Sequence, residues 1–341
     1  MATKEIQFIQ RENGATVPAQ FPVIVSASRS TDIPGFYADW FMHRLRVGYS
    51  AWTNPFNGVK SYVSYRDTRL IVFWSKNPEA LLKQGGLLDY LEEKDIHCYI
   101  QYTLNDYVTE KLEKGVPSVE RRIDTFKRLV DRLGVGKVIW RFDPLILTDK
   151  ITVQELLKKA KSIGDQLKGY TEKMVFSFAD IDAYRKVRSN LNTNNIRYRE
   201  FAESDMLEFA AGIQLLNQGW GYTLATCGEK INIDQYGIVH NKCVDDDLII
   251  RFFSDDVKLM NFLGVEITGG DLFNPEKTII KHKNNKDKGQ RKFCGCIISK
   301  DIGEYNTCAH LCEYCYANSS KDIALRHLNQ HKLNPFGESI Y

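Results

Sequence analysis

The sequence lacks a long hydrophobic run. Its longest uninterrupted apolar stretch is Leu70–Trp74, whereas a bilayer-spanning helix needs about 20 such residues. The first residues, Met1–Asn13, mix charged with apolar side chains, so they show neither the continuous apolar core nor the small-residue cleavage site of a signal peptide. Both absences favour a cytoplasmic protein with no membrane partner.

Cysteine and charge of one sign are also scarce. The chain has 8 cysteines in 341 residues, and 46 Lys and Arg against 43 Asp and Glu give a net charge of +3. So few cysteines exclude a small disulfide-stapled scaffold, and a charge this small does not by itself imply nucleic acid. In a reducing cytoplasm, clustered cysteines are typical of metal sites or of catalysis.

Several common catalytic and cofactor motifs are missing. No G-x-G-x-x-G turn follows the first predicted strand, which disfavours a dinucleotide-binding fold. No G-x-S-x-G and no H-x-E with paired cysteines occur, so a hydrolase or a deaminase is the least favoured enzyme class.

What the sequence does contain is a repeated alternation of strand-like and helix-like segments. The strand-like segments are short, continuous apolar runs: Val23–Val25, Tyr49–Trp52, Leu70–Trp74, Cys98–Tyr102, Val138–Trp140, Met174–Phe178 and Tyr222–Ala225. Segments of helical period lie between them: Phe36–Leu45, Pro78–Leu91, Val119–Leu133, Val153–Leu167 and Ser204–Leu216. Continuous apolar strands are typical of a parallel sheet covered on both faces. The pattern therefore predicts an α/β fold, and we expect a TIM-like (β/α) barrel, full or partial.

Candidate site residues follow the predicted strands, because barrel enzymes place their chemistry where strands end. A charged side chain that follows an apolar strand needs a partner or a ligand, and Arg29, Asp32, Arg141 and Asp143 are in that position. Tyr102, at another strand end, either stacks on a substrate or belongs to the core. The predicted catalytic residues are Arg141, Asp143, Lys76 and Tyr102.

The densest chemical feature is the spacing C-x3-C-x2-C formed by Cys308, Cys312 and Cys315. Three thiolates on a short loop can hold three irons of a [4Fe–4S] cluster, which leaves the fourth iron open to a small-molecule ligand. The alternative is a zinc ion with His310 as the fourth ligand.

The other cysteines suggest a further site. Four of them make a complete ligand set for a second [4Fe–4S] cluster or a structural zinc, with His240 as a weaker substitute ligand; they are Cys227, Cys243, Cys294 and Cys296. The plain alternative is that one or more are packed thiols. Cys98, inside an apolar strand, is expected to be structural.

The cysteine loop, with Tyr314 before its last cysteine, resembles the cluster loop of the radical S-adenosylmethionine (SAM) superfamily. Its "CEYCYA" segment is most similar to spore photoproduct lyase. The whole chain resembles a bacterial family described as domain of unknown function 1848. That resemblance runs from about Val23 to Ser320 through segments such as "SASRSTDIP", "WRFDP" and "CGCIISKDIGEYNTCAHLCEYCYAN".

The resemblance implies a function. Cys308, Cys312 and Cys315 would hold a [4Fe–4S] cluster, and SAM would chelate its open iron. Reductive cleavage would release a 5′-deoxyadenosyl radical that abstracts hydrogen from a substrate, with nucleic acid or a nucleotide as candidates. An electron donor such as flavodoxin or ferredoxin would be the partner. The implied cofactor-binding residues are Tyr314 beside the adenine, Asp32 at the amino group, and Arg29 and Ser30.

The position of the loop departs from the superfamily, where it usually follows the first barrel strand. We expect the first strand–loop–helix unit to be moved to the C-terminus, as Phe293–Ser299, Lys300–Tyr316 and Lys321–Leu328, with Val23–Val25 taking the second place in the barrel. This gives residues 1–226 as barrel core and 227–341 as a cysteine-rich region that closes it. The competing function is a non-enzymatic zinc or iron–sulfur protein that contacts nucleic acid through Lys277–Lys292.

Overall fold

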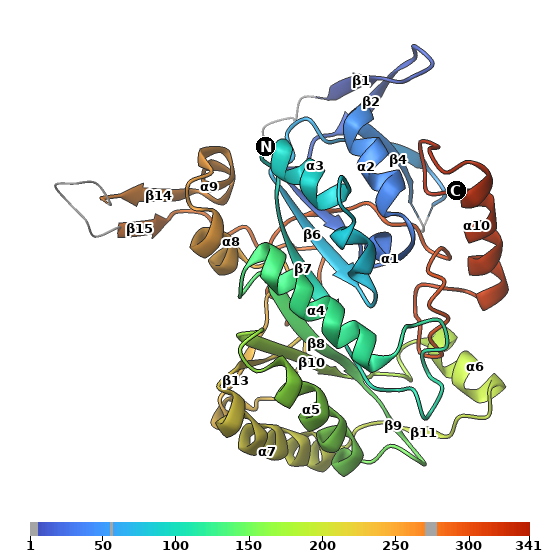
Figure 1. The fold of residues 1–341 in the computed structure, drawn as a ribbon, viewed down its shortest axis with the longest axis vertical. Coiled ribbons are helices and arrows are strands. Elements are labelled where there is room, and N and C mark those ends of the chain that lie inside the picture. The colour runs from blue at the N-terminus through green and yellow to red at the C-terminus, as the bar shows by residue number, and fades with distance from the viewer. Residues whose placement is uncertain (1–5, 55–56, 270–277) are drawn as a thin grey trace.

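A computed structural model describes residues 6–54, 57–269 and 278–341. Within these ranges, eight strands form one sheet (Figure 1). Every neighbouring pair in it is parallel. In spatial order the strands are β13 (Ile238–His240), β12 (Thr223–Thr226), β10 (Lys173–Phe178), β8 (Val138–Leu145), β7 (His97–Thr103), β6 (Leu70–Ser75), β3 (Ile24–Ala27) and β16 (Lys300–Asp301).

The α/β class with a parallel sheet is confirmed, but a closed barrel is not found. The edges of the sheet in the described residues are β13 and β16, which do not pair with each other. Both edges are very short: β16 aligns only Lys300 and Asp301 with β3. Such short edge strands offer few backbone groups for closure, so the sheet remains open.

One face of the sheet is covered by helices, as the apolar strands require. Side chains from α2 to α5 and from α7 pack on it as one core, and α4 lies across β7 and β8 in Figure 1. The helices of the described residues are α1 (Ile33–Phe36), α2 (Ala38–Val47), η1 (Pro78–Leu82), α3 (Leu87–Glu93), α4 (Val119–Leu133), α5 (Val153–Leu167), α6 (Arg185–Thr193), α7 (Glu203–Trp220), η2 (Asp234–Tyr236), α8 (Asp246–Phe253), α9 (Val257–Leu263) and α10 (Lys321–Leu333).

The other face of the sheet is covered by the segment that follows β13. Leu70, Val72 and Tyr99 point to this face and form a second core with Ile249 of α8 and Leu259 of α9. Cysteines 243, 294 and 296 belong to the same core. The C-terminal third of the chain is therefore part of the packing of the main sheet.

The predicted strand Tyr49–Trp52 is a strand but not part of the main sheet. It forms β4 (Tyr49–Thr53) in a side sheet of order β1-β2-β5-β4, with β1 (Gln7–Gln10), β2 (Thr16–Gln20) and β5 (Lys60–Ser64). Two short pairs complete the strands: β9 (Leu147–Thr148) with β11 (Tyr198–Arg199), and β14 (Val265–Thr268) with β15 (Thr278–Lys281). An apolar run indicates a strand but does not choose its sheet.

The helix of the predicted C-terminal strand–loop–helix unit is confirmed, but its strand is not. Phe293–Ser299 forms no strand, and the strand that lies parallel to β3 is β16, Lys300–Asp301, at the start of the predicted loop. The predicted helix Lys321–Leu328 is α10, capped by Ser320, which accepts from Ile323 N at 3.1 Å. Beyond α10 the tail is anchored to α2, where Trp40 Nε1 donates to Gly337 O at 2.9 Å. Of the helices described, none has the length and hydropathy to cross a membrane.

Candidate active site and metal centres

The cysteine loop is held against the segment that follows β7. Gly115 N donates to His310 O at 2.8 Å, and Glu313 N donates to Leu112 O at 2.9 Å. Cys312 is buried, and its backbone bridges to Glu113. These backbone contacts place the loop at the carboxyl edge of the parallel strands, where open α/β sheets bind their ligands.

A buried ion pair fixes the same loop from the side of β3. His310 Nε2 donates to Asp32 Oδ2 at 2.6 Å, and His310 Nδ1 donates to Gly115 O at 3.2 Å. Asp32 also accepts from Ser75 Oγ at 2.7 Å and from Lys76 N at 2.8 Å. Burial opposes ionisation, but His310 and the other donors outweigh it and lower the pKa of Asp32.

This pair changes the roles expected for both residues. Both ring nitrogens of His310 face an oxygen, one of Asp32 and one of Gly115, so neither is directed at the cysteines as a zinc ligand. His310 is therefore not a fourth zinc ligand in this arrangement. Both oxygens of Asp32 are also occupied, because Gly35 N and Ser75 bond to Oδ1 and the other donors bond to Oδ2. Asp32 positions the loop and has no acceptor left for the amino group of SAM.

Lys76 lies at the centre of a buried charged cluster beside the loop. Its Nζ donates to Glu113 Oε1 at 2.8 Å and to Tyr314 Oη at 2.9 Å, and the Tyr314 hydroxyl also donates to Glu113. Burial lowers the pKa of Lys76, but the charges of Glu113 and Cys312 outweigh it and raise that pKa. Likewise, Lys76 and Arg122 outweigh burial and lower the pKa of Glu113. The cluster keeps a cation next to Cys312.

The expected cofactor residues after β3 are tied to Asp301 of β16. Arg29 N donates to Asp301 Oδ2 at 2.8 Å, and Ser30 Oγ donates to Asp301 Oδ1 at 3.4 Å. Ser28 Oγ joins them at 2.8 Å. Gly303 must be small here, because a Cβ on it would lie 1.8 Å from Ser28 Oγ. Ser30 thus helps to bind the C-terminal unit to β3.

Arg141 and Asp143 form an ion pair. The sequence pattern predicts that they follow the strand Val138–Trp140, but β8 continues to Leu145 and includes both residues. Ser177 Oγ donates to Asp143 Oδ1. Asn105 joins this pair to the cysteine loop: its Oδ1 accepts from Asp143 N at 2.9 Å, and its Nδ2 donates to Tyr314 Oη at 3.4 Å. A continuous hydrogen-bonded path therefore runs from β8 to the loop.

Tyr102 is buried in the core and away from the cysteine loop, which does not support its predicted catalytic role. Its ring stacks on Phe126 of α4 at 5.4 Å, and its hydroxyl donates to Arg122 O at 3.0 Å. Side chains alternate between the two faces of a strand, and Tyr102 is on the face that the helices cover. It belongs to the core.

The positions of the loop sulfurs can be compared with those around a zinc ion. Among the described residues, the sulfurs of Cys308, Cys312 and Cys315 do not all lie within 4.8 Å of one another. The ligand atoms of Asp245–Asp247 do meet that distance. Around a single zinc ion the sulfurs lie about 3.8 Å apart, given tetrahedral Zn–S bonds of about 2.3 Å. In this structure the three sulfurs are therefore not gathered around one point of the size of a zinc ion.

Three residues of the site escaped prediction from the sequence. Glu113 lies in the irregular segment between β7 and α4, where no pattern marks it. Asn105 stands only two residues past β7, and Asp301 lies just beyond the predicted strand Phe293–Ser299. Asn105 and Asp301 would have been found by including a few more residues after the end of each predicted strand.

The closeness of the loop to Gly115 gives a testable prediction. A Cβ at Gly115 would lie 2.6 Å from Ala309 O and 2.9 Å from His310 O, although the backbone there suits any residue. Gly115→Ala should therefore lower the free energy of unfolding by about 1–3 kcal/mol and reduce metal retained by the loop. Denaturant unfolding and metal analysis measure these effects.

Gly219→Ala is the matched control. Its Cβ would meet nothing within 4 Å, and Gly219 is exposed in α7, so the change should stabilise the helix slightly. Equal metal content and stability in the two variants would contradict the close contact at Gly115.

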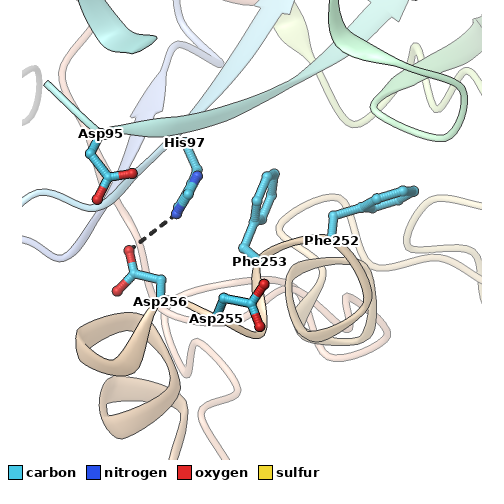
Figure 2. A pocket seen from close by; sticks show the side chains of 6 residues that line it. All are labelled: Asp95, His97, Phe252, Phe253, Asp255 and Asp256. Carbon is cyan, nitrogen blue, oxygen red and sulfur yellow. Dashed lines mark ion pairs between the residues drawn. The ribbon is translucent and has the colours of Figure 1, made fainter. Parts of the chain in front are cut away.

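A pocket at the amino ends of the parallel strands, opposite the cysteine loop, is not part of this site. Figure 2 shows it where β7 begins, and its volume is ≈ 170 Å³, below the usual range for ligand pockets. His97 stacks on Phe253 at 4.5 Å, and Asp256 accepts from Arg69 Nε at 2.7 Å. The pocket marks the contact of α8 and α9 with the sheet.

Two secondary expectations have little support in the structure. His240 is exposed on the edge strand β13. Of the basic stretch Lys277–Lys292, Lys277 lies outside the described residues, while Lys281 pairs with Asp246 and Lys283 Nζ donates to Asn261 O at 3.3 Å. These lysines have partners within the protein, which weakens the nucleic-acid-binding alternative.

Comparison with known proteins gives one match. The family model described as Domain of unknown function (DUF1848) matches residues 24–317. No curated protein and no solved structure matches the chain. The matched range includes β3, β16 and the cysteine loop, and α10 lies beyond its end. The chain belongs to the DUF1848 family.

Proposed function

We propose that this protein is a radical SAM enzyme whose Cys308, Cys312 and Cys315 hold a [4Fe–4S] cluster with one open iron. The observation that carries the proposal is the C-x3-C-x2-C loop at the carboxyl edge of the parallel sheet, brought there by a unit that pairs with β3. When bound, cluster and SAM together supply a 5′-deoxyadenosyl radical for hydrogen abstraction.

The donor set and its surroundings fit such a cluster. Three thiols share one loop, and the His310 ring is bonded to Asp32 instead of facing the cysteines as a ligand. Lys76 places a positive charge beside Cys312, and this charge stabilises a thiolate-bound anionic cluster. Asp32 and Gly115 hold the loop in place through His310.

The side chains near the loop suggest where a substrate is bound. Asp143 is half-buried and is held by Arg141 of its own strand β8 and by Ser177 of the neighbouring strand β10. Asn105 connects it to Tyr314. We propose that Asp143 faces the substrate and that Lys76 and Tyr314 face the cofactor. A nucleotide or nucleic acid as substrate, and flavodoxin or ferredoxin as electron donor, rest on the family resemblance alone.

The test is anaerobic incubation of the iron- and sulfide-reconstituted protein with dithionite and SAM, with 5′-deoxyadenosine measured by chromatography. We expect 5′-deoxyadenosine to accumulate even without the substrate, at a slow rate. Cluster-loaded protein that yields none, or a colourless protein that retains stoichiometric zinc after anaerobic purification, would overturn the proposal.

A further inference from the structure

The cysteines outside the loop converge from three separate segments. Cys227 follows β12, Cys243 follows β13, and Cys294 and Cys296 precede β16. The sulfurs of Cys227 and Cys243 are 3.4 Å apart. The Cys296 thiol interacts with those of both Cys243 and Cys294. Segments far apart in sequence thus bring four thiols together on the face of the sheet that carries α8 and α9.

Three arginines surround these thiols. Arg141 Nη1 donates to Cys243 Sγ at 3.0 Å, and Arg291 Nη2 donates to Cys227 O at 3.3 Å. The Arg29 guanidinium stacks over the Trp74 ring at 4.9 Å, and its buried Nη2 has no hydrogen-bond partner. Arg141 is buried and Arg29 is partly buried, whereas Arg291 is exposed. The guanidinium of Arg141 lies between Asp143 and Cys243, so a negative charge at the thiols would be stabilised there.

Backbone and amide donors also point at the sulfurs. Cys243 N and Val244 N lie 3.2 and 3.5 Å from Cys296 Sγ, and Asn241 Nδ2 lies 3.1 Å from Cys243 Sγ. N–H groups directed at sulfur stabilise a metal-bound thiolate and tune the metal that it holds. These donors are therefore arranged as the outer shell of a metal site.

We propose that Cys227, Cys243, Cys294 and Cys296 bind a second [4Fe–4S] cluster. N–H donors directed at sulfur, as found here, tune iron–sulfur clusters, and zinc at the same four thiols is the alternative that the metal analysis below distinguishes. With four protein thiolates the cluster has no open iron. This centre therefore does not take SAM, and its chemistry differs from that of the loop.

Arg141 links the thiols of the second centre to Asp143 and, through it, to the residues beside the cysteine loop. One guanidinium nitrogen contacts Cys243 and the other pairs with Asp143. Asp143 is joined through Asn105 to Tyr314. The positive charge of Arg141 favours the reduced, more negative state of an adjacent cluster. Arg141→Gln should therefore retain the iron but shift the midpoint potential of the second cluster to a more negative value.

The experiment is an iron, sulfide and zinc analysis of anaerobically reconstituted full-length protein and variants. We expect about eight irons per wild-type chain, as two cubane clusters require, and about four in C294A/C296A. The triple variant C308A/C312A/C315A should also retain about four irons. The two sets of variants therefore test the second cluster and the loop cluster independently. Cys98→Ala, a change at the buried cysteine outside both sets, is the control and should retain all the iron.

Several results would overturn the second cluster. Wild-type protein with about four irons and one zinc would assign the site to zinc, and iron lost only in the triple variant would leave these thiols without metal. The wild-type iron and sulfide count does not depend on whether any variant folds. A redox titration followed by electron paramagnetic resonance (EPR) gives a second readout, because an unshifted potential in Arg141→Gln would contradict its contact with the cluster.

Discussion

Cys312→Ala is expected to abolish 5′-deoxyadenosine formation and to remove about four irons per chain. Cys312 is the most buried cysteine of the loop, beside Lys76 and the bridge to Glu113. Three cysteines leave one iron of the cubane open to SAM. With only two cysteines, a second iron also loses its protein ligand. Iron analysis and chromatography of the SAM reaction measure both effects on the same sample.

The fold should survive this change. The loop is attached through backbone hydrogen bonds and through His310, none of which involves the Cys312 thiol. Far-ultraviolet circular dichroism should therefore match the wild type. Cys98→Ala, which removes a buried thiol from another part of the core, should leave the product yield unchanged. Full product formation by Cys312→Ala would show that the loop is not the site of cleavage.

Asp32→Asn should produce the largest loss of stability among changes near the site. The carboxylate accepts from Gly35, Ser75, Lys76 and His310 in a buried position, and an amide turns one acceptor into a donor that faces N–H groups. Breaking a buried pair on one side costs about 3–5 kcal/mol, because the other charge is left uncompensated. Urea unfolding of wild type and variant measures the difference.

Asp39→Asn is the matched control, because Asp39 pairs with Lys83 on the surface and both side chains are about 60% exposed. An exposed ion pair contributes at most about 1 kcal/mol. If the two substitutions cost the same, Asp32 does not support the loop as described. Asp32→Asn should also lower the iron retained by the triad, since His310 loses its anchor while all three cysteines remain.

Local sequence patterns were sufficient for the elements that carry strong periodicity and caps. The predicted helices Val119–Leu133 and Val153–Leu167 match α4 and α5, where Ser118 and Thr152 cap the first turns. The predicted helix Pro78–Leu91 instead divides into η1 and α3 around Gly85 and Gly86. Glycine there permits a turn that the apolar pattern does not reveal.

Tertiary choices were harder to predict, because they depend on partners distant in sequence. The sequence shows that neighbouring side chains of a strand point to opposite faces of the sheet. It does not show which face the helices cover, so the surroundings of Tyr102 and Arg141 could not be predicted. Asp32 was expected to bind a cofactor, yet its partner His310 lies 278 residues away and satisfies it. In contrast, the spacing of Cys308, Cys312 and Cys315 is local, so their grouping was evident from the sequence.

The most direct test of the central claim is the EPR spectrum of the dithionite-reduced, reconstituted protein before and after addition of SAM. An iron without a protein ligand changes its electronic environment when SAM binds to it, whereas fully ligated iron does not. We predict that saturating SAM shifts the signal of the loop cluster and that this shift is lost in Cys312→Ala. A reduced cluster signal that SAM leaves unchanged would contradict the assignment of an open iron to Cys308, Cys312 and Cys315.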